Sequence, residues 1–174
     1  GGVILFDETI NQTSSSGKSI PDLISGSGAV PGIKVDTGAK DLANSNEEKI
    51  TEGLDGLRDR LKKYYKLGAR FTKWRGVYSI SEKYPSELAI TSNAHALARY
   101  SAIVQESGMV PIVEPELLMD GDHSADVCLS KTSEVIKNCF DQLILHKIDL
   151  SGIILKPNMI LAGNQCKDKI YNEE

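Results

Sequence analysis

Charged residues stand at the ends of four apolar stretches of this 174-residue sequence. They are Lys34 and Asp36, Lys73 and Arg75, Glu114 and Glu116, and Lys156. Taken singly, each charge is most simply explained as a solvent-facing member of a surface ion pair. Four charged ends in corresponding positions are better explained as parts of one shared site.

Lysine, arginine and glutamate in such a set favour one kind of chemistry. A lysine amine attacks a carbonyl carbon only when it is neutral, and its ordinary pKa is about 10.4. Neighbouring cations lower that pKa, so if the cations share one opening, the most enclosed amine becomes the best nucleophile. The same cations bind phosphate groups, and Glu114 is suited to carry protons to and from a carbinolamine. The set predicts Schiff-base chemistry on a sugar phosphate.

Strands and helices must alternate along the chain to position these residues. Short apolar runs predict strands at residues 3–6, 32–36, 69–75, 109–113 and 152–155. Helical spacing is shown by Leu54, Leu57, Leu61 and Tyr64 or Tyr65, then by Leu97, Ala98, Ser101 and Val104, and then by Val127, Val135, Cys139 and Leu143. Helix starts are expected at Ser92 and at Ser124 or Asp126, and helix ends at Gly68 and Gly108. Residues 11–28, rich in Ser and Gly, predict a loop.

The spacing of the charged strand ends indicates the fold. Lys34, Lys73, Glu114 and Lys156 follow one another at intervals of about 40 residues, the length of one β/α unit. We therefore predict an α/β fold, a (β/α)8 TIM barrel that is incomplete here, with about five of its eight parallel strands. The carboxyl ends of the strands in such a barrel meet on one face, where catalytic groups collect. A doubly wound open sheet is disfavoured because no glycine-rich phosphate fingerprint follows the first strand.

Composition excludes several other classes of function. A net charge of -4 argues against nucleic acid as the main partner. The apolar runs are much shorter than the roughly 20 residues of a membrane span, so no membrane association is expected. The three cysteines, which form no CxxC pair, are Cys128, Cys139 and Cys166. The three histidines, which lack the spacing of metal ligands, are His95, His123 and His146. They indicate free thiols in a reducing compartment and no metal site.

Several segments, in order along the chain, resemble class I fructose-bisphosphate aldolases. The matching segments are residues 2–9 (GVILFDET), 31–36 (PGIKVD), 52–57 (EGLDGL), 68–75 (GARFTKWR), 110–116 (VPIVEPE) and 152–159 (GIILKPNM). The fifth is the most distinctive, and the sixth resembles the family's signature around its Schiff-base lysine. The resemblance extends along nearly the whole chain.

The resemblance implies a role for each charged residue. Lys156 matches the Schiff-base nucleophile, and Glu114 the residue that transfers protons as the carbinolamine forms and breaks. Lys73 would stabilise intermediates, and Glu116 would orient the basic cluster. The substrate-binding set, expected at the phosphate-bearing end of the sugar, is Lys34, Arg75 and Asp36. The implied reaction, a step of glycolysis and gluconeogenesis, is the reversible cleavage of fructose 1,6-bisphosphate to dihydroxyacetone phosphate and glyceraldehyde 3-phosphate in the cytoplasm, with no cofactor and no metal.

This sequence departs from the family pattern in two residues and in length. Ser151 stands where glutamate is usual, and Thr37 where a basic residue is frequent, which weakens the phosphate patch slightly. Members of the family run to about twice this length, and the first residues here lack an initiator methionine. We therefore expect residues 1–174 to be a single partial domain, the second to sixth β/α units of the barrel. Alone it is expected to be poorly stable and inactive, whereas the full-length enzyme would be a homotetramer.

Two other functions remain open at this stage. One is a non-catalytic scaffold that binds actin or acidic cytoplasmic tails, such as those of adhesins, through the basic mouth of the barrel. The other is a different Schiff-base barrel enzyme, of the deoxyribose-phosphate aldolase or transaldolase type. Residues 111–116 and the strand with Lys73, Trp74 and Arg75 argue against the second.

Overall fold

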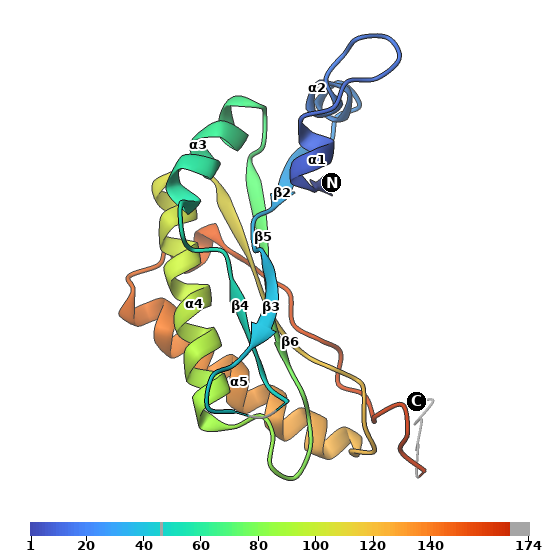
Figure 1. Cartoon of the computed structure of the whole chain (residues 1–174), viewed down its shortest axis with the longest axis vertical. Helices are drawn as coiled ribbons and strands as arrows, with labels where there is room; N and C mark the ends of the chain where they lie inside the picture. Colours follow the sequence, from blue (N-terminus) through green and yellow to red (C-terminus); the bar gives the residue numbers. More distant parts are fainter. Residues whose placement is uncertain (46, 168–174) are drawn as a thin grey trace.

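The structure is a computed structural model that describes residues 1–45 and 47–167. A parallel five-stranded sheet forms its centre (Figure 1). The strands of this sheet are β1 (Gly2–Leu5), β2 (Val30–Lys34), β5 (Phe71–Tyr78), β6 (Val110–Leu117) and β7 (Ile154–Leu155). The other elements are α1 (Asp7–Ile10), α2 (Ile20–Gly26), β3 (Gly38–Asp41), β4 (Lys49–Glu52), α3 (Leu57–Lys66), α4 (Glu87–Glu106), α5 (Ala125–Leu145) and the 3-10 helix η1 (Leu150–Gly152).

The order of the strands in space is their order along the chain. The sheet runs β1-β2-β5-β6-β7, and every neighbouring pair is parallel. Parallel neighbours need a crossover, and the segments containing α1 and α2, then α3, α4 and α5, supply these connections in turn. The predicted α/β organisation with a parallel sheet is confirmed.

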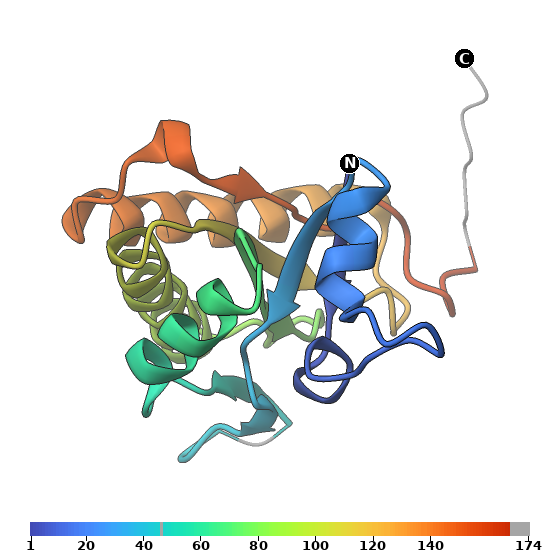
Figure 2. The same ribbon diagram turned by 90° about the horizontal axis from the view of Figure 1, so that it is seen from above.

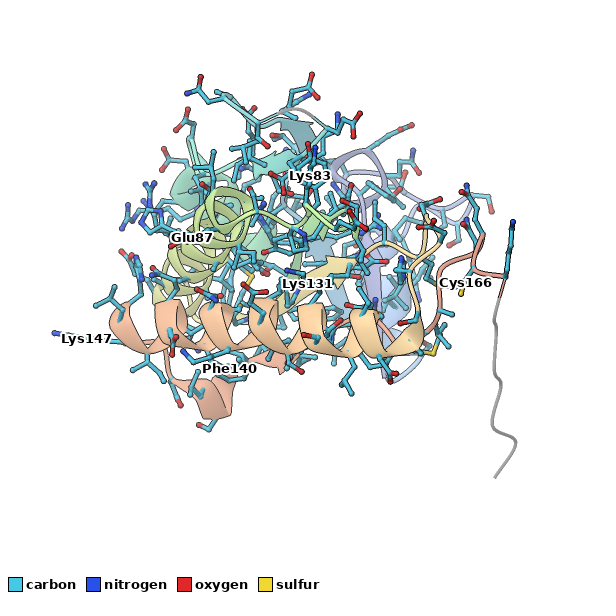
Figure 3. The ribbon with its side chains drawn as sticks, turned by 90° about the horizontal axis from the view of Figure 1, so that it is seen from below. Lys83, Glu87, Lys131, Phe140, Lys147 and Cys166 are labelled. Atoms are coloured by element: carbon cyan, nitrogen blue, oxygen red, sulfur yellow. The ribbon has the colours of Figure 1, made fainter. Side chains whose placement is uncertain are left out.

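Helices cover one face of the sheet. Helix α4 packs against β5 and β6, and α5 packs against α4 and β6. In Figure 2, α3, α4 and α5 lie together to one side of the strands. Figure 3 views the molecule across α5, where Phe140 lies partly buried against the core and Lys131 reaches solvent.

The other face of the sheet divides into an apolar half and a charged half. Alternation along each strand places Phe71, Lys73 and Arg75 on this face, while Trp74 is fully buried on the helix side. The apolar half, at the amino ends of the strands, lines a hollow with Ile4, Val30, Phe71, Ile112 and Ile154. Gly32 leaves room there for the Phe71 ring, because a Cβ at this position would lie 2.3 Å from it. Ile4 and Ile154 remain 38% and 47% exposed on this face.

A helix within the predicted loop corrects the sequence expectation for residues 11–28. Helix α2 begins after Ser19, whose hydroxyl oxygen accepts a hydrogen bond from the Asp22 amide, and Pro21 stands in its first turn. A cap and an early proline favour a helix start. The helix has only seven residues, too few to show a repeating apolar pattern.

The predicted start of α4 is also wrong. Its cap is Ser86, which accepts a hydrogen bond from the Ala89 amide, so Ser92 lies inside the helix. Buried Glu48 accepts hydrogen bonds from the amide and hydroxyl of Ser86 and thereby fixes this end of α4. The cap prediction at Ser124 is confirmed, since its hydroxyl accepts from the Val127 amide.

Three further details of the sequence prediction need correction. Val127 is 40% exposed, and the neighbouring Cys128 is buried in its place. Strand β7 is shorter than residues 152–155, because η1 includes Gly152. Strands β5 and β6 continue past the predicted ends to Tyr78 and Leu117.

The hairpin formed by β3 and β4 was not predicted and ties the sheet to α4. Thr51 of β4 donates its hydroxyl to the Arg75 carbonyl oxygen at 2.7 Å. The Asn93 side chain of α4 accepts from the Thr51 amide and donates to the Lys49 carbonyl oxygen. The hairpin thus supports β5 next to its two charged residues, Lys73 and Arg75.

A buried tyrosine joins the two central strands from behind. The Tyr100 hydroxyl lies 2.6 Å from Thr72 Oγ1 on β5 and donates to the Ile112 carbonyl oxygen on β6 at 3.2 Å. Its ring packs against Trp74 with 5.3 Å between centroids. Burial raises the pKa of Tyr100, so the hydroxyl stays protonated and able to donate.

Replacing Tyr100 with phenylalanine should destabilise the fold. The loss of both bonds from a fully buried group is expected to lower the free energy of unfolding by about 1–3 kcal/mol, measured by urea denaturation. Tyr65, which is 42% exposed, provides the control, because Tyr65→Phe should change stability by less than about 0.5 kcal/mol. Equal effects of the two substitutions would contradict the bridging role.

Candidate active site

A buried carboxylate connects two lysines on neighbouring strands. Glu114 of β6 is 2% exposed. Its Oε1 lies 2.6 Å from Lys156 Nζ, and its Oε2 lies 3.0 Å from Lys73 Nζ. The structure therefore brings Lys73, Glu114 and Lys156 into direct contact.

Strand register explains why these three side chains meet. Lys73 stands opposite Ile112, so Glu114 is two residues further along β6 on the same face. Lys156 follows β7 directly, and its amide donates to the Val113 carbonyl oxygen at 2.9 Å. The Lys156 side chain is 58% exposed while that of Lys73 is 23% exposed. The expectation that the nucleophile is the most enclosed amine therefore does not select Lys156, which is instead the amine that a substrate can reach.

A second ion pair lies one step further along the same strands. Arg75 of β5 donates to a carboxylate oxygen of Glu116 on β6. Both side chains are partly exposed. This pair therefore fixes the guanidinium group beside the opening above Glu114.

Lys34 and Asp36 form a separate pair at the edge of this cluster. Lys34 of β2 is the register partner of Lys73, but its Nζ donates to Asp36. Asp36 Oδ1 also accepts from the Gly38 amide. Asp36 Oδ2 is buried and has no hydrogen-bond partner among the described residues. Lys34 thus lies on the charged face without contacting Glu114.

The whole set has one more cation than it has carboxylates. Lys34, Lys73, Arg75 and Lys156 face Asp36, Glu114 and Glu116. A phosphate group is attracted to such a surplus. The set thus provides an accessible amine, a carboxylate within proton-transfer distance of it, and cations for an anionic substrate.

Two residues that hold this site in place carried no marked pattern in the sequence. Asn158 Oδ1 accepts from the Leu117 amide at the end of β6, and its Nδ2 donates to Thr132 of α5. Arg60 of α3 donates to the carbonyl oxygens of Val35 and Gly53, which fixes the segment after β2. Asn158 stands two residues after Lys156, inside the segment 152–159 that resembles the family signature, and these were its only signals.

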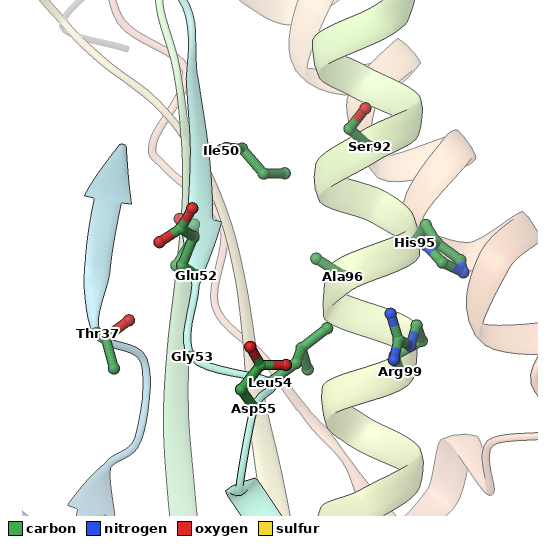
Figure 4. A pocket seen from close by; sticks show the side chains of 11 residues that line it. Thr37, Ile50, Glu52, Gly53, Leu54, Asp55, Ser92, His95, Ala96 and Arg99 are labelled. Atoms are coloured by element: carbon green, nitrogen blue, oxygen red, sulfur yellow. The ribbon is translucent and has the colours of Figure 1, made fainter. Parts of the chain in front are cut away.

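A hollow of about 490 Å³ lies apart from these charged residues, between β4 and α4. Figure 4 shows Glu52 and Asp55 on one wall and Arg99 on the other. None of the sequence-predicted site residues lines it.

The three histidines lie in a helix, at the end of a helix and in a loop. His95 is in α4, His146 caps α5 and His123 is in the loop after β6. Within residues 1–45 and 47–167, no group of three or more metal-ligating side chains forms. Burial raises the pKa of Cys139 to about 12, which makes this thiol unreactive. In the same described part of the chain, no helix has the length and apolar character to cross a membrane.

The complete chain matches one family of enzymes. The family model described as fructose-bisphosphate aldolase class-I covers residues 1–174. This chain belongs to the class I fructose-bisphosphate aldolase family. The chain is 51% identical to cytosolic fructose-bisphosphate aldolase 4 of Arabidopsis thaliana, and the match covers 99% of this chain and 44% of that protein. It is 50% identical to fructose-bisphosphate aldolase C of Carassius auratus, and that match covers the whole of this chain and 48% of that protein.

The fold comparison agrees with the family assignment. The structure matches fructose-bisphosphate aldolase from Plasmodium falciparum, in complex with TRAP and a small-molecule inhibitor, with a TM-score of 0.95 and 45% identity. The match covers 98% of this chain and 50% of that one. The predicted incomplete TIM barrel is confirmed, and the chain spans about half the length of these aldolases.

His123 should make the stability of this aldolase chain depend on pH. It is 7% exposed, neither ring nitrogen has a partner among the described residues, and burial lowers its pKa. Unfolding restores a pKa of about 6.5, so below that pH the unfolded chain binds more protons and stability is lost. We expect the free energy of unfolding to fall from about pH 8 to about pH 5, and to fall less steeply in His123→Gln. Identical slopes in urea titrations would contradict this.

Proposed function

We propose that this aldolase chain carries the lysine chemistry of reversible fructose 1,6-bisphosphate cleavage to dihydroxyacetone phosphate and glyceraldehyde 3-phosphate. The observation that supports it is the contact of Glu114 with both Lys73 and Lys156. An accessible amine beside a buried proton acceptor is the arrangement that Schiff-base formation requires.

Lys156 acts as the nucleophile in this proposal. Its ammonium proton passes to Glu114 across 2.6 Å, and the free amine attacks the substrate carbonyl carbon. The carbinolamine then takes a proton on its hydroxyl group, which leaves as water, so Glu114 serves as base and then as acid. The resulting iminium accepts the electron pair of the breaking carbon–carbon bond, a role that needs no metal or other cofactor. The hydroxyl group of the departing fragment becomes the aldehyde and loses its proton to Glu114, which is again a carboxylate after water has left.

The remaining charged residues hold the site and the substrate. The ammonium group of Lys73 contacts the Glu114 carboxylate, which also contacts Lys156. Lys73 is therefore close enough to stabilise negative charge on an oxygen next to the reacting carbon. Glu116 orients Arg75, and Arg75 with Lys34 binds the phosphate-bearing end of the sugar. Asp36 holds Lys34 in position for that contact.

Residues 1–174 form, in this proposal, the second to sixth β/α units of a single barrel domain. The apolar half of the inner face, with Ile4 and Ile154 partly exposed, supports a requirement for further strands before cleavage proceeds. We further propose a homotetrameric complete enzyme in the cytoplasm, in line with the cytosolic name of the Arabidopsis relative.

A scaffold function is the second candidate. The Plasmodium falciparum aldolase to which this structure is similar is in complex with TRAP. Binding of actin or an acidic protein tail by the cations around Arg75 would not require the amine of Lys156. Covalent trapping therefore separates the two functions.

Borohydride trapping tests the nucleophile. We expect dihydroxyacetone phosphate and sodium borohydride to attach the sugar to Lys156 in the Arabidopsis aldolase whose matching segment is replaced by residues 1–174. Mass spectrometry should locate the adduct, which Lys156→Arg should abolish and Lys147→Arg should retain. An adduct on another lysine, or none while the unaltered Arabidopsis enzyme is trapped, would refute the proposal.

Replacing Glu114 with glutamine in the same chimaera tests the proton-transfer role. The amide cannot accept the ammonium proton of Lys156, so the single-turnover rate of Schiff-base formation should fall by about 10²–10⁴-fold. Glu134, an exposed residue of α5, is the matched control, and Glu134→Gln should leave the rate unchanged. A fall of less than about tenfold in Glu114→Gln would assign proton transfer to another group.

A further inference from the structure

Helix α3 concentrates positive charge on a chain that is acidic as a whole. Residues 57–70 contain six of the 20 lysines and arginines but one of the 24 acidic residues. Leu57, Leu61 and Tyr64 turn one face of the helix into the core. This packing directs the opposite face, with its basic residues, to solvent.

Three of these cations form a straight row. Arg58, Lys62 and Lys66 are four residues apart, so they lie along one ridge of the helix at steps of about 6 Å. A shallow cleft of about 320 Å³ runs beside the row, lined also by Tyr65 of α3 and by Glu106 and Ser107 at the end of α4.

Acidic neighbours neutralise only part of the row. Glu106 pairs with Arg58 at 3.0 Å, and Asp59 lies 3.6 Å from Lys62. Lys66 forms no ion pair with any residue that the structure describes. The Arg70 guanidinium lies 4.2 Å from the centre of the Tyr65 ring. The cleft therefore retains an excess of positive charge.

We propose that this cleft, defined by Arg58, Lys62, Lys66 and Glu106, binds an extended acidic peptide segment of another protein. On one side of an extended chain, side chains recur every second residue, about 6.7 Å apart. This spacing matches the cationic row over three consecutive contacts. The partner thus carries aspartate or glutamate at alternate positions.

Two features of the cleft favour a peptide over a nucleic acid. Glu106 lies within the basic surface, where it repels a continuous phosphate backbone but accepts hydrogen bonds from peptide N–H groups. Arg70 covers one face of the Tyr65 ring and so blocks stacking of a base on that face.

The cleft is separate from the charged residues around Glu114. Helix α3 and the final turn of α4 lie at the end of the molecule where β5 and β6 begin (Figure 1). Lys73 is the third residue of β5, Glu114 is the fifth residue of β6 and Lys156 follows β7, and none of the three lines the cleft. The inference is therefore independent of the proposed aldolase activity.

Fluorescence anisotropy with a labelled peptide tests the inference on the chimaera in which residues 1–174 replace the matching segment of the Arabidopsis aldolase. The probe carries aspartate at three alternate positions separated by serine, and its binding should weaken as salt is added. The double substitution Lys62→Ala with Lys66→Ala should weaken binding by about fivefold or more. Lys63→Ala with Lys131→Ala removes the same charge outside the row and should weaken it by less than about twofold.

Spacing and partner class are tested with two further probes. A peptide of the same composition with its three aspartates adjacent should bind more weakly than the alternating peptide, and so should a single-stranded oligonucleotide of equal charge. Equal binding of the two peptides would overturn the extended arrangement, and tighter oligonucleotide binding would overturn the choice of partner. No binding of the alternating peptide at low salt, or equal losses in the two double variants, would overturn the site itself.

Discussion

The buried carboxylate of Glu114 is held in place by the amines of Lys73 and Lys156. The central sheet positions all three residues. A carboxylate as enclosed as that of Glu114 is costly to bury unless cations and hydrogen bonds replace its water. Lys73 and Lys156 supply those cations from the strands on either side. A register shift of one residue would turn Lys73 towards the helices and Trp74 towards the opening. The site and the strand register therefore stabilise each other.

Elements outside the sheet hold that register. Tyr100 of α4 binds β5 and β6 together at Thr72 and Ile112, and the hairpin residue Thr51 holds the Arg75 carbonyl oxygen. Helix α4 is itself fixed at its start, where the carboxylate of Glu48 accepts two hydrogen bonds from Ser86. None of these bonds involves a side chain of the charged cluster. Their effect on chemistry is to restrict where the Lys73 and Glu114 side chains can lie.

The sequence revealed the parts of the structure that repeat. Apolar runs at a regular interval marked the parallel strands, and charges at the ends of those runs marked Lys73, Glu114 and Lys156 as neighbours. Features built from single contacts left no such pattern. Ser86 and Ser92 are equally good caps by composition, and only the contact with distant Glu48 distinguishes them. The role of Asn158 likewise depends on Leu117 and Thr132, which are close to it only after folding.

Charge alone does not couple the two positive regions of the molecule, which are the cluster around Glu114 and the cleft beside α3. Glu114 is the fifth residue of β6, so about 13 Å of strand separates it from the end of β6 where α3 lies, whereas charges in physiological salt are screened over about 8 Å. An anion on α3 would therefore change the field at Glu114 very little. Any influence between them would have to pass through the packing of Tyr65, Arg70 and the start of β5, which is a rigid part of the sheet. Each region therefore selects its anionic partner independently.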